Sequence, residues 1–272
     1  MNYVELCRQT LRASGTGTGA NLVTLQGTGD PGSRNYNDFE ALVARYVAEA
    51  WVRIQTLHED WSWRIREFEA RLPADTATLA WNAMRDSEGN RSIPEPPGFR
   101  RWLIQSPNDP RGLDEWYITQ YDRDSNGNDQ REYNGPIRAV EWRELRRLKS
   151  DRIPRVGRPQ YVAETVDGLS LSFYPTPGTP PTPTGTAVGG DPAYDLSGLY
   201  RAGVQQLHED HDEPDGLPEE YHDIVKWRAV MIVNELDEAG VSWQAAASNY
   251  RDLLDSLERV YLPTVEVGQA LV

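Results

Sequence analysis

The sequence contains a single cysteine, Cys7, among its 272 residues. One thiol excludes an internal disulfide and a zinc site built from cysteines. The apolar residues near Cys7 have helical spacing, which predicts a short helix over residues 2–13 that ends at Gly15. We therefore interpret Cys7 as a small buried residue of this helix and not as a reactive thiol.

Long apolar runs are also lacking. No stretch approaches the ~20 apolar residues needed to cross a bilayer. The opening sequence MNYVELCRQTLRASG has no basic segment followed by an apolar one, the pattern of a secretory signal. We expect a protein without a membrane partner that is made, and at first kept, in a cytoplasm.

Positive charge is scarce, because 28 Lys and Arg residues stand against 42 Asp and Glu residues for a net charge of −14. Tight non-specific binding to nucleic acid requires cations on phosphates, so this balance argues against it, although DNA can still pass nearby. G-x-S-x-G, H-E-x-x-H and P-loop motifs are absent, and no carboxylate pair stands out in so acidic a chain. We nominate no catalytic, cofactor-binding or metal residue and expect no enzymatic activity.

Aromatic residues are plentiful, with nine Trp and thirteen Tyr, and the apolar fraction of 38% suffices for a core. The length fits one large domain or two modest ones. A continuous apolar stripe predicts a long helix over residues 36–58. A second helix opens at Pro218 and stops at Gly240, and a third follows from Ser242 to about Pro263, so the last two form a helical hairpin.

The middle of the chain, residues 62–216, predicts short strands joined by polar loops. It includes one short helix with a basic face over residues 140–149 and a Pro/Gly-rich segment at 175–192 that predicts an extended surface loop. The β-rich stretches are 62–72, 116–119, 161–165, 169–174 and 194–207. The fold class predicted is α+β: a helical bundle from residues 1–61 and 217–262 with an inserted antiparallel β-rich region at 62–216 and a C-terminal tail at 263–272.

The stretch DRDSNGNDQREY at 122–133 matches the first half of an EF-hand calcium loop. The twelfth position of such a loop requires a bidentate Glu, but here it is Tyr133, and β-rich sequence replaces the entering helix. Asn126 and Gly127 between two such flanks favour a β-hairpin turn. We predict a turn and keep calcium binding as the alternative.

The segment HEDHDE at 208–213 is a second candidate for metal binding. His208 and His211 lie three residues apart with carboxylates between them, a plausible donor set for a divalent metal if the segment is helical. A charge run before Pro214 more often forms a solvated loop, which is the interpretation that we favour. His58 and His222 each stand alone on predicted helices.

Two motifs in the helical regions resemble the head-to-tail adaptor proteins of tailed bacteriophages, most closely the podovirus type. One is a "Q-x-L-H-x-x-W" type segment formed by Gln55, Leu57, His58 and Trp61, after an opening MNYVELCRQTLRASGTGTG. The other is an "L-P-x-x-Y-H-x-x-I-x-W-x-A" type segment, formed by Leu217, Pro218, Tyr221, His222, Ile224, Trp227 and Ala229. The resemblance covers both ends of the chain, and segment 175–192 looks like an insertion relative to the family.

The resemblance implies a structural virion protein, assembled in the host cytoplasm and located in the head-tail neck. It would form a homo-oligomeric ring, of dodecameric type, beneath the portal protein and extend the DNA channel toward the nozzle or tail-tube proteins. DNA would pass without specific binding. We expect residues 263–272 to dock on the portal. The alternative is a metal-dependent hydrolase or carbohydrate-binding module that uses the β-rich region and the acids at 208–213.

Overall fold

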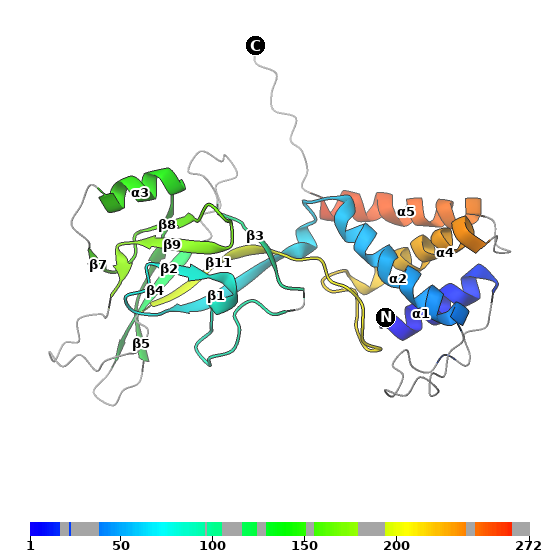
Figure 1. Cartoon of the computed structure of the whole chain (residues 1–272), viewed down its shortest axis with the longest axis horizontal. Helices are drawn as coiled ribbons and strands as arrows, with labels where there is room; N and C mark the ends of the chain where they lie inside the picture. The colour runs from blue at the N-terminus through cyan, green and yellow to red at the C-terminus, as the bar shows by residue number, and fades with distance from the viewer. Residues whose placement is uncertain are drawn as a thin grey trace, which may run out of the picture. The chain divides into compact units, whose positions relative to one another are not determined.

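The computed structural model divides the chain into two compact units, each described here by itself (Figure 1). The helical unit comprises Met1–Arg64 and Val204–Val272, and the β unit comprises Ile65–Gly203. The α+β prediction is confirmed. The structure describes residues 1–16, 22, 38–95, 97–104, 116–123, 129–150, 155–178, 194–237 and 243–262, and only the backbone of residue 38 and of those in 121–133 and 236–237.

The inserted region is shorter than expected. Residues 62–64 and 204–216 group with the helices, so the insertion runs over 65–203 and not over 62–216. The β unit ends at Gly203 because the 205–217 segment forms hydrogen bonds with residues of the helical unit. The antiparallel pairing of Ile65 with Arg201 brings the two ends of the β unit together.

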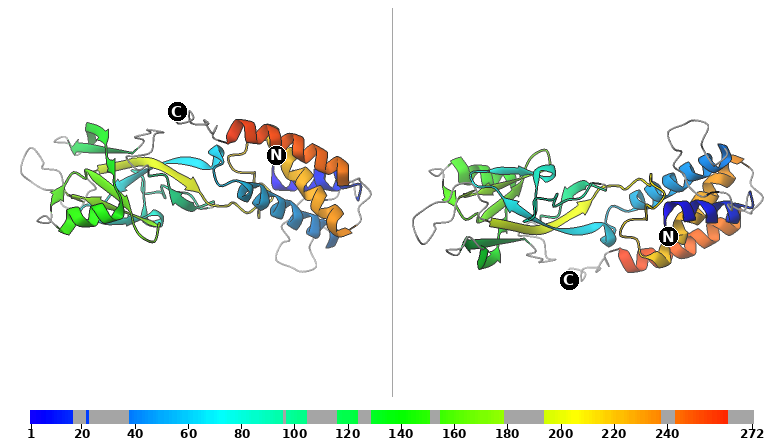
Figure 2. Two further views of the ribbon diagram at one scale, coloured as in Figure 1. Left: turned by 90° about the horizontal axis from the view of Figure 1, so that it is seen from above. Right: turned by 90° about the horizontal axis from the view of Figure 1, so that it is seen from below.

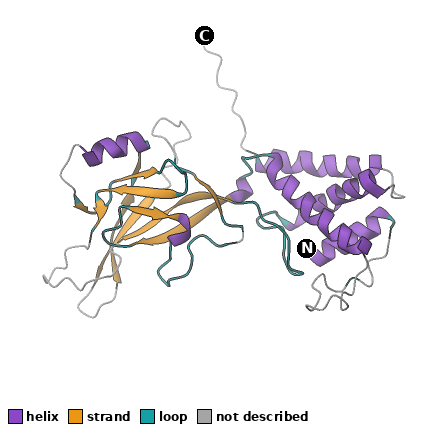
Figure 3. Ribbon diagram, in the orientation of Figure 1, coloured by secondary structure: helices purple, strands orange, loops and turns teal. Residues whose placement is uncertain are grey.

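Four α-helices make up most of the helical unit, and Figure 3 shows them as a separate group from the strands. They are α1 (Tyr3–Ser14), α2 (Asp38–Leu57), α4 (Asp223–Asp237) and α5 (Trp243–Tyr261). Asn2 caps α1 by accepting a hydrogen bond from the Glu5 amide, and Gly15 ends it with φ 71°. The predicted helices are confirmed, except that the helix expected to open at Pro218 is preceded by a 3-10 turn at Glu219–Tyr221 and begins as α4 at Asp223. Gly240, Ser242 and the 263–272 tail lie outside the described residues.

The core of the helical unit forms between helices from both ends of the sequence. Figure 2 shows in two further views that α1 and α2 lie beside α4, which in turn lies beside α5. Trp51 and Trp61 are fully buried, and the Trp51 ring stacks on that of Trp63 with 5.5 Å between centroids. Cys7 is buried in this core, and burial raises the pKa of its thiol, so its interpretation as a packing residue is confirmed.

The β unit contains two main sheets. A five-stranded sheet has the order β1-β11-β4-β5, with β3 also pairing with β11, and a four-stranded sheet has the order β2-β9-β8-β6. The first consists of β1 (Ile65–Leu72), β3 (Phe99–Trp102), β4 (Tyr117–Arg123), β5 (Asp129–Pro136) and β11 (Tyr194–Ala202). The second consists of β2 (Thr78–Ala80), β6 (Arg138–Ala139), β8 (Tyr161–Glu164) and β9 (Ser170–Tyr174).

Apolar residues from both sheets share one core. Phe68 of β1 contacts the rings of Trp102 and Trp116, each at 5.4 Å between centroids, and Phe173 of β9 belongs to the same cluster. Trp116 lies over Gly198 of β11, where an added Cβ would be 2.7 Å from the indole ring. A glycine is therefore required at the point where this ring covers the strand.

The antiparallel prediction holds for most strand pairs but is wrong for two. β6 pairs with β8 in parallel, and β10 (Thr176–Pro177) pairs with β7 (Val156–Gly157) in parallel. The first pair is parallel because α3 (Trp142–Ser150), the predicted basic helix, forms the crossover between its strands. The start of the predicted 175–192 loop is thus strand β10, and residues 179–192 lie outside the described part.

The backbone around residues 122–133 answers the calcium question in favour of a hairpin. β4 and β5 are antiparallel neighbours, with Arg123 paired with Asp129, and a strand occupies the place of an EF-hand's entering helix. Asn126 and Gly127 lie outside the described residues. In the described part of the chain, no helix has the length and apolar character to span a membrane.

Candidate functional site

The most connected polar site in the helical unit joins α2 to the chain that returns from the β unit. The Gln55 side chain donates to the Gln205 carbonyl at 2.8 Å and accepts from the Gln205 amide at 2.9 Å. These two bonds satisfy both backbone groups of Gln205. The Gln55 side chain therefore binds the backbone at Gln205 in the way that a neighbouring β-strand would. We call Gln55 and Gln205 the glutamine clasp.

The side chain of Gln205 extends this clasp. Its Oε1 accepts from the Trp51 indole at 2.9 Å and from the Asp215 amide at 2.8 Å, while its Nε2 donates to the Glu213 carbonyl at 2.9 Å. Gln55 and Gln205 are both buried. A buried amide with every polar atom paired is a strong positional constraint, so the clasp fixes the 205–215 segment against α2.

His58 and Trp61 of the first motif, together with Arg64 just after it, close the C-terminal end of α2. The Trp61 indole donates to the Ile54 carbonyl at 3.0 Å, and Arg64 Nη1 donates to the Gln55 carbonyl at 3.0 Å. His58 packs its ring edge against Trp61 and pairs with Glu258 of α5 at 2.7 Å. These bonds satisfy carbonyls that a helix end leaves unpaired, so the motif has a structural role.

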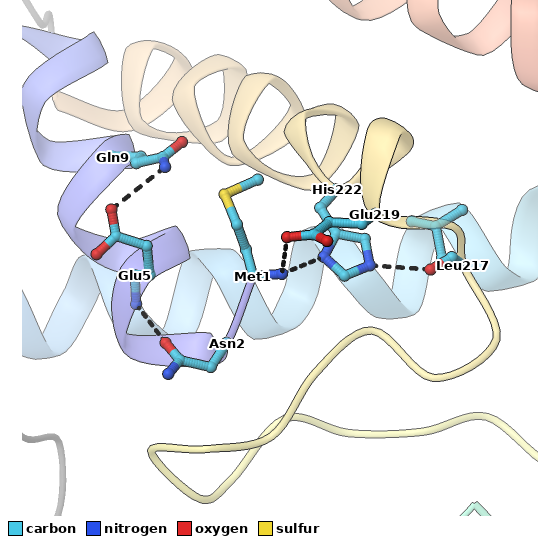
Figure 4. A network of polar contacts seen from close by, with 7 residues as sticks. All are labelled: Met1, Asn2, Glu5, Gln9, Leu217, Glu219 and His222. Atoms are coloured by element: carbon cyan, nitrogen blue, oxygen red, sulfur yellow. Dashed lines mark hydrogen bonds and ion pairs between the residues drawn. The ribbon is translucent and has the colours of Figure 1, made fainter.

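The second motif positions the N-terminus. His222 is buried, and its Nδ1 lies 2.7 Å from the Met1 ammonium while its Nε2 lies 2.9 Å from the Leu217 carbonyl (Figure 4). A carbonyl only accepts and an ammonium only donates, so the ring carries its proton on Nε2 and accepts at Nδ1. Glu219 lies 3.7 Å from the same ammonium. His222 therefore connects α1 to the start of α4.

Further residues of the second motif also pack within the helical unit. Leu217, Ile224 and Ala229 belong to its buried core. The Tyr221 hydroxyl lies 3.2 Å from that of Ser256, and its ring contacts Tyr261 of α5. Of the residues in both motifs, Leu57 is the prominent exposed apolar one, at 46% exposure. Both motifs thus build the helical unit and present no reactive group.

The 208–213 segment is a turn and not a helix. The Asp212 carboxylate accepts hydrogen bonds from the amides of His208 and Glu209 at 2.7 and 2.8 Å. The carbonyls of Asp210 and Asp212 accept from the amides of Val4 and Tyr3. The segment is thus not helical, as the loop interpretation predicts, but it also holds the start of α1, which that interpretation did not include. The described residues include no group of three or more His, Cys, Asp or Glu placed to hold a metal.

A lysine–serine pair in the β unit resembles the dyad of some hydrolases. Lys149 of α3 donates to the Ser172 hydroxyl of β9 at 2.8 Å, and burial lowers the pKa of the lysine. Ser172, however, is fully buried, and its hydroxyl donates to the Ala77 carbonyl at 3.1 Å. A serine that no substrate reaches is not a nucleophile here, and the pair anchors α3 on the sheet.

Sequence reasoning missed the glutamine clasp and the role of the N-terminal ammonium. The motif contains Gln55, but its partner Gln205 lies 150 positions away in the sequence. The two bonds between them involve the backbone of Gln205, and no side-chain pattern in the sequence predicts a backbone contact. The contact to Met1 involves no side-chain pattern either. No known protein-family profile matches the chain, and no curated protein is significantly similar to it.

Proposed function

We propose that this protein is a structural subunit of the neck of a tailed bacteriophage, a head-to-tail adaptor that assembles as a ring beneath the portal and extends its DNA channel. The proposal originates in the resemblance of the two helical motifs. The observation that carries it is that both motifs are used to build one helical unit, from segments at opposite ends of the sequence.

The chemistry of the described residues supports a role in assembly and not in turnover. The histidines of the motifs make structural contacts, and the serine of the candidate lysine–serine pair is buried. The strong negative charge suits a channel subunit, because a surface that repels phosphates lets DNA move. The hydrolase alternative relies on acids at 208–213, and there the Asp212 carboxylate is committed to its own turn.

Native mass spectrometry of the purified protein tests the proposal, alone and mixed with the portal protein encoded by the same genome. In the mixture, the expected result is a complex of a defined number of copies bound to the portal. The protein alone can be monomeric or form a ring, because the portal can act as the template for assembly. A chain that stays monomeric and does not bind the portal at micromolar concentration would overturn the proposal. Removal of residues 263–272 is expected to weaken portal binding, and unchanged binding would refute that part.

A further inference from the structure

Helix α3 has two sharply different faces. Trp142, Leu145 and Leu148 pack with Val140, Ala163 and Tyr174 of the β unit. Lys149 lies on the same side and bonds to Ser172. The inner face is therefore anchored by apolar contacts and one partly buried hydrogen bond, which fixes the direction of the outer face.

The outer face of α3 presents three arginines. Arg143, Arg146 and Arg147 are exposed, and spacings of three and four residues place them on one side of the helix. Figure 1 shows α3 on the outside of the β unit, beside β8 and β9. Arginine suits ion pairs at interfaces because its planar group binds carboxylates through two parallel bonds, and it is enriched at interfaces where lysine is depleted.

Charge is divided unequally between the two units. The helical unit contains 22 acidic and 10 basic side chains, a net charge of −12, whereas the β unit contains 20 and 18, a net charge of −2. Residues 209–220, which we call the acidic segment, contain seven carboxylates and no Lys or Arg. Four of the seven belong to exposed residues, namely Glu209, Glu213, Glu219 and Glu220.

We infer that the outer face of α3 docks on the acidic segment of a second copy of this chain. The inference deepens the proposed function, on which it rests, by assigning one contact between neighbouring subunits. A basic face on one unit and an acidic surface on the other give a head-to-tail interface, the kind that closes into a ring. Each subunit then offers one surface of each sign to its two neighbours.

A nucleic-acid partner fits α3 less well. Non-specific DNA affinity requires several phosphate contacts, about 6–10 in well-studied proteins. The outer face supplies three arginines with Glu144 exposed among them, on a chain of net charge −14. The acidic segment of the same kind of subunit supplies the complementary charge without this repulsion.

The test compares self-association and portal-templated assembly of the full-length wild type with those of R143E/R146E at about 50 mM salt, using sedimentation velocity and native mass spectrometry. The expected result is an association constant at least tenfold lower for R143E/R146E. E209R/E213R is expected to weaken association too, and the four-fold variant that combines both pairs is expected to recover at least half of the wild-type complex. Higher salt should weaken the wild type most.

The matched control is R91E/R100E, which changes the net charge equally at two exposed arginines of the β unit that lie outside α3 and the strands it contacts. Wild-type complexes that persist unchanged in R143E/R146E, or that weaken equally in the control, would overturn the α3 contact while leaving the adaptor proposal intact. Loss of binding to a double-stranded DNA fragment with assembly unaffected would overturn it too. A wild type that never assembles, alone or on the portal, overturns both.

Discussion

The helical unit and the β unit close on themselves by different means. The helical unit joins two chain segments through hydrogen bonds between residues some 150–221 positions apart, at the glutamine clasp and at His222. The β unit closes through β1 and β11, paired along eight residues of each strand, over a shared aromatic core. Both units have an apolar core, but buried polar side chains link the two ends of the chain in the unit with −12 of the charge, whereas a backbone ladder between strands links them in the near-neutral one.

Among the substitutions that test this difference between the two units, Gln55→Ala is expected to lower stability most. The substitution leaves the buried amide and carbonyl of Gln205 without partners, at about 1–3 kcal/mol for each group. We expect a loss of about 2–4 kcal/mol in the free energy of unfolding. Hydrogen exchange resolved by peptide should rise in α2 and α4 and stay unchanged in β9.

The control for Gln55→Ala is Gln206→Ala, the exposed neighbour of Gln205. It should change stability by less than about 0.5 kcal/mol. Equal losses from both substitutions would mean that the clasp contributes no more than any surface glutamine, and the contrast between the units would lose its main support.

The next effect concerns packing in the β unit. In Gly198→Ala the new Cβ would lie 2.7 Å from the Trp116 ring, which is buried and packs against Phe68 and Trp102 and so has little room to move. We expect a loss of about 1–3 kcal/mol and faster exchange in β1 and β4, with the helical unit unaffected. Gly89→Ala offers a contrast, because that glycine has open space but φ +87°, so its cost is conformational alone.

A smaller effect is expected when Gly-Ser is added ahead of Met1. The extension moves the ammonium away from His222 and leaves the buried Nδ1 without its donor. We expect a loss of about 1–2 kcal/mol, measured by thermal unfolding. The same two residues added after Val272 serve as the control. An unchanged midpoint in the N-terminal variant would show that the contact adds nothing to stability.

Local pattern predicted the elements well, and long-range contacts less well. The helices at 3–14, 38–57 and 243–261 follow from 3.6-residue periodicity, which every turn repeats. The sequence predicts that the insertion ends at 216, whereas it ends at 203, because the 194–207 pattern resembles a single strand and does not reveal that Gln205 bonds to Gln55. Trp243 lies on the apolar stripe of α5 yet is 48% exposed. An apolar stripe predicts which face of a helix is buried, but it does not predict how far along the helix the neighbouring helices extend to cover that face.

The sequence of the 169–174 stretch shows a second limit, because its apolar residues alternate with Ser170 and Ser172 as in a strand with one solvent-exposed face. Ser172 has the position of an outward residue in a one-sided sheet, but it is fully buried. The cause is α3, which covers that side and supplies Lys149 as a hydrogen-bond donor. A strand covered on both faces loses the polar alternation that would mark its solvent side. The sequence does not predict the burial of Ser172, because its contact with Lys149 forms only when α3 packs on β9.

The smallest expected changes in stability come from two carboxylates in one hairpin of the β unit, Glu164 and Asp167, and they are opposite in sign. Burial raises the pKa of Glu164, against a lowering effect of Arg101, so its charge is disfavoured in the folded state. The native state then binds more protons than the unfolded one near the raised pKa, and this cost is present above that pH and vanishes below the ordinary value of 4.5. Glu164→Gln should therefore stabilise slightly at pH 7 and lose this advantage near pH 4.

Asp167, two positions after Thr165, gives the matched opposite case. The Thr165 hydroxyl and the Leu169 amide donate to its carboxylate and lower its pKa, so its contribution to stability is present above the ordinary value of 3.8 and is lost as pH falls through the lowered one. Asp167→Asn should destabilise at pH 7 and become neutral near pH 2. Urea unfolding of both variants across this pH range measures the two slopes. Slopes of equal sign would mean that the hairpin responds to net charge and not to these specific hydrogen bonds and burial.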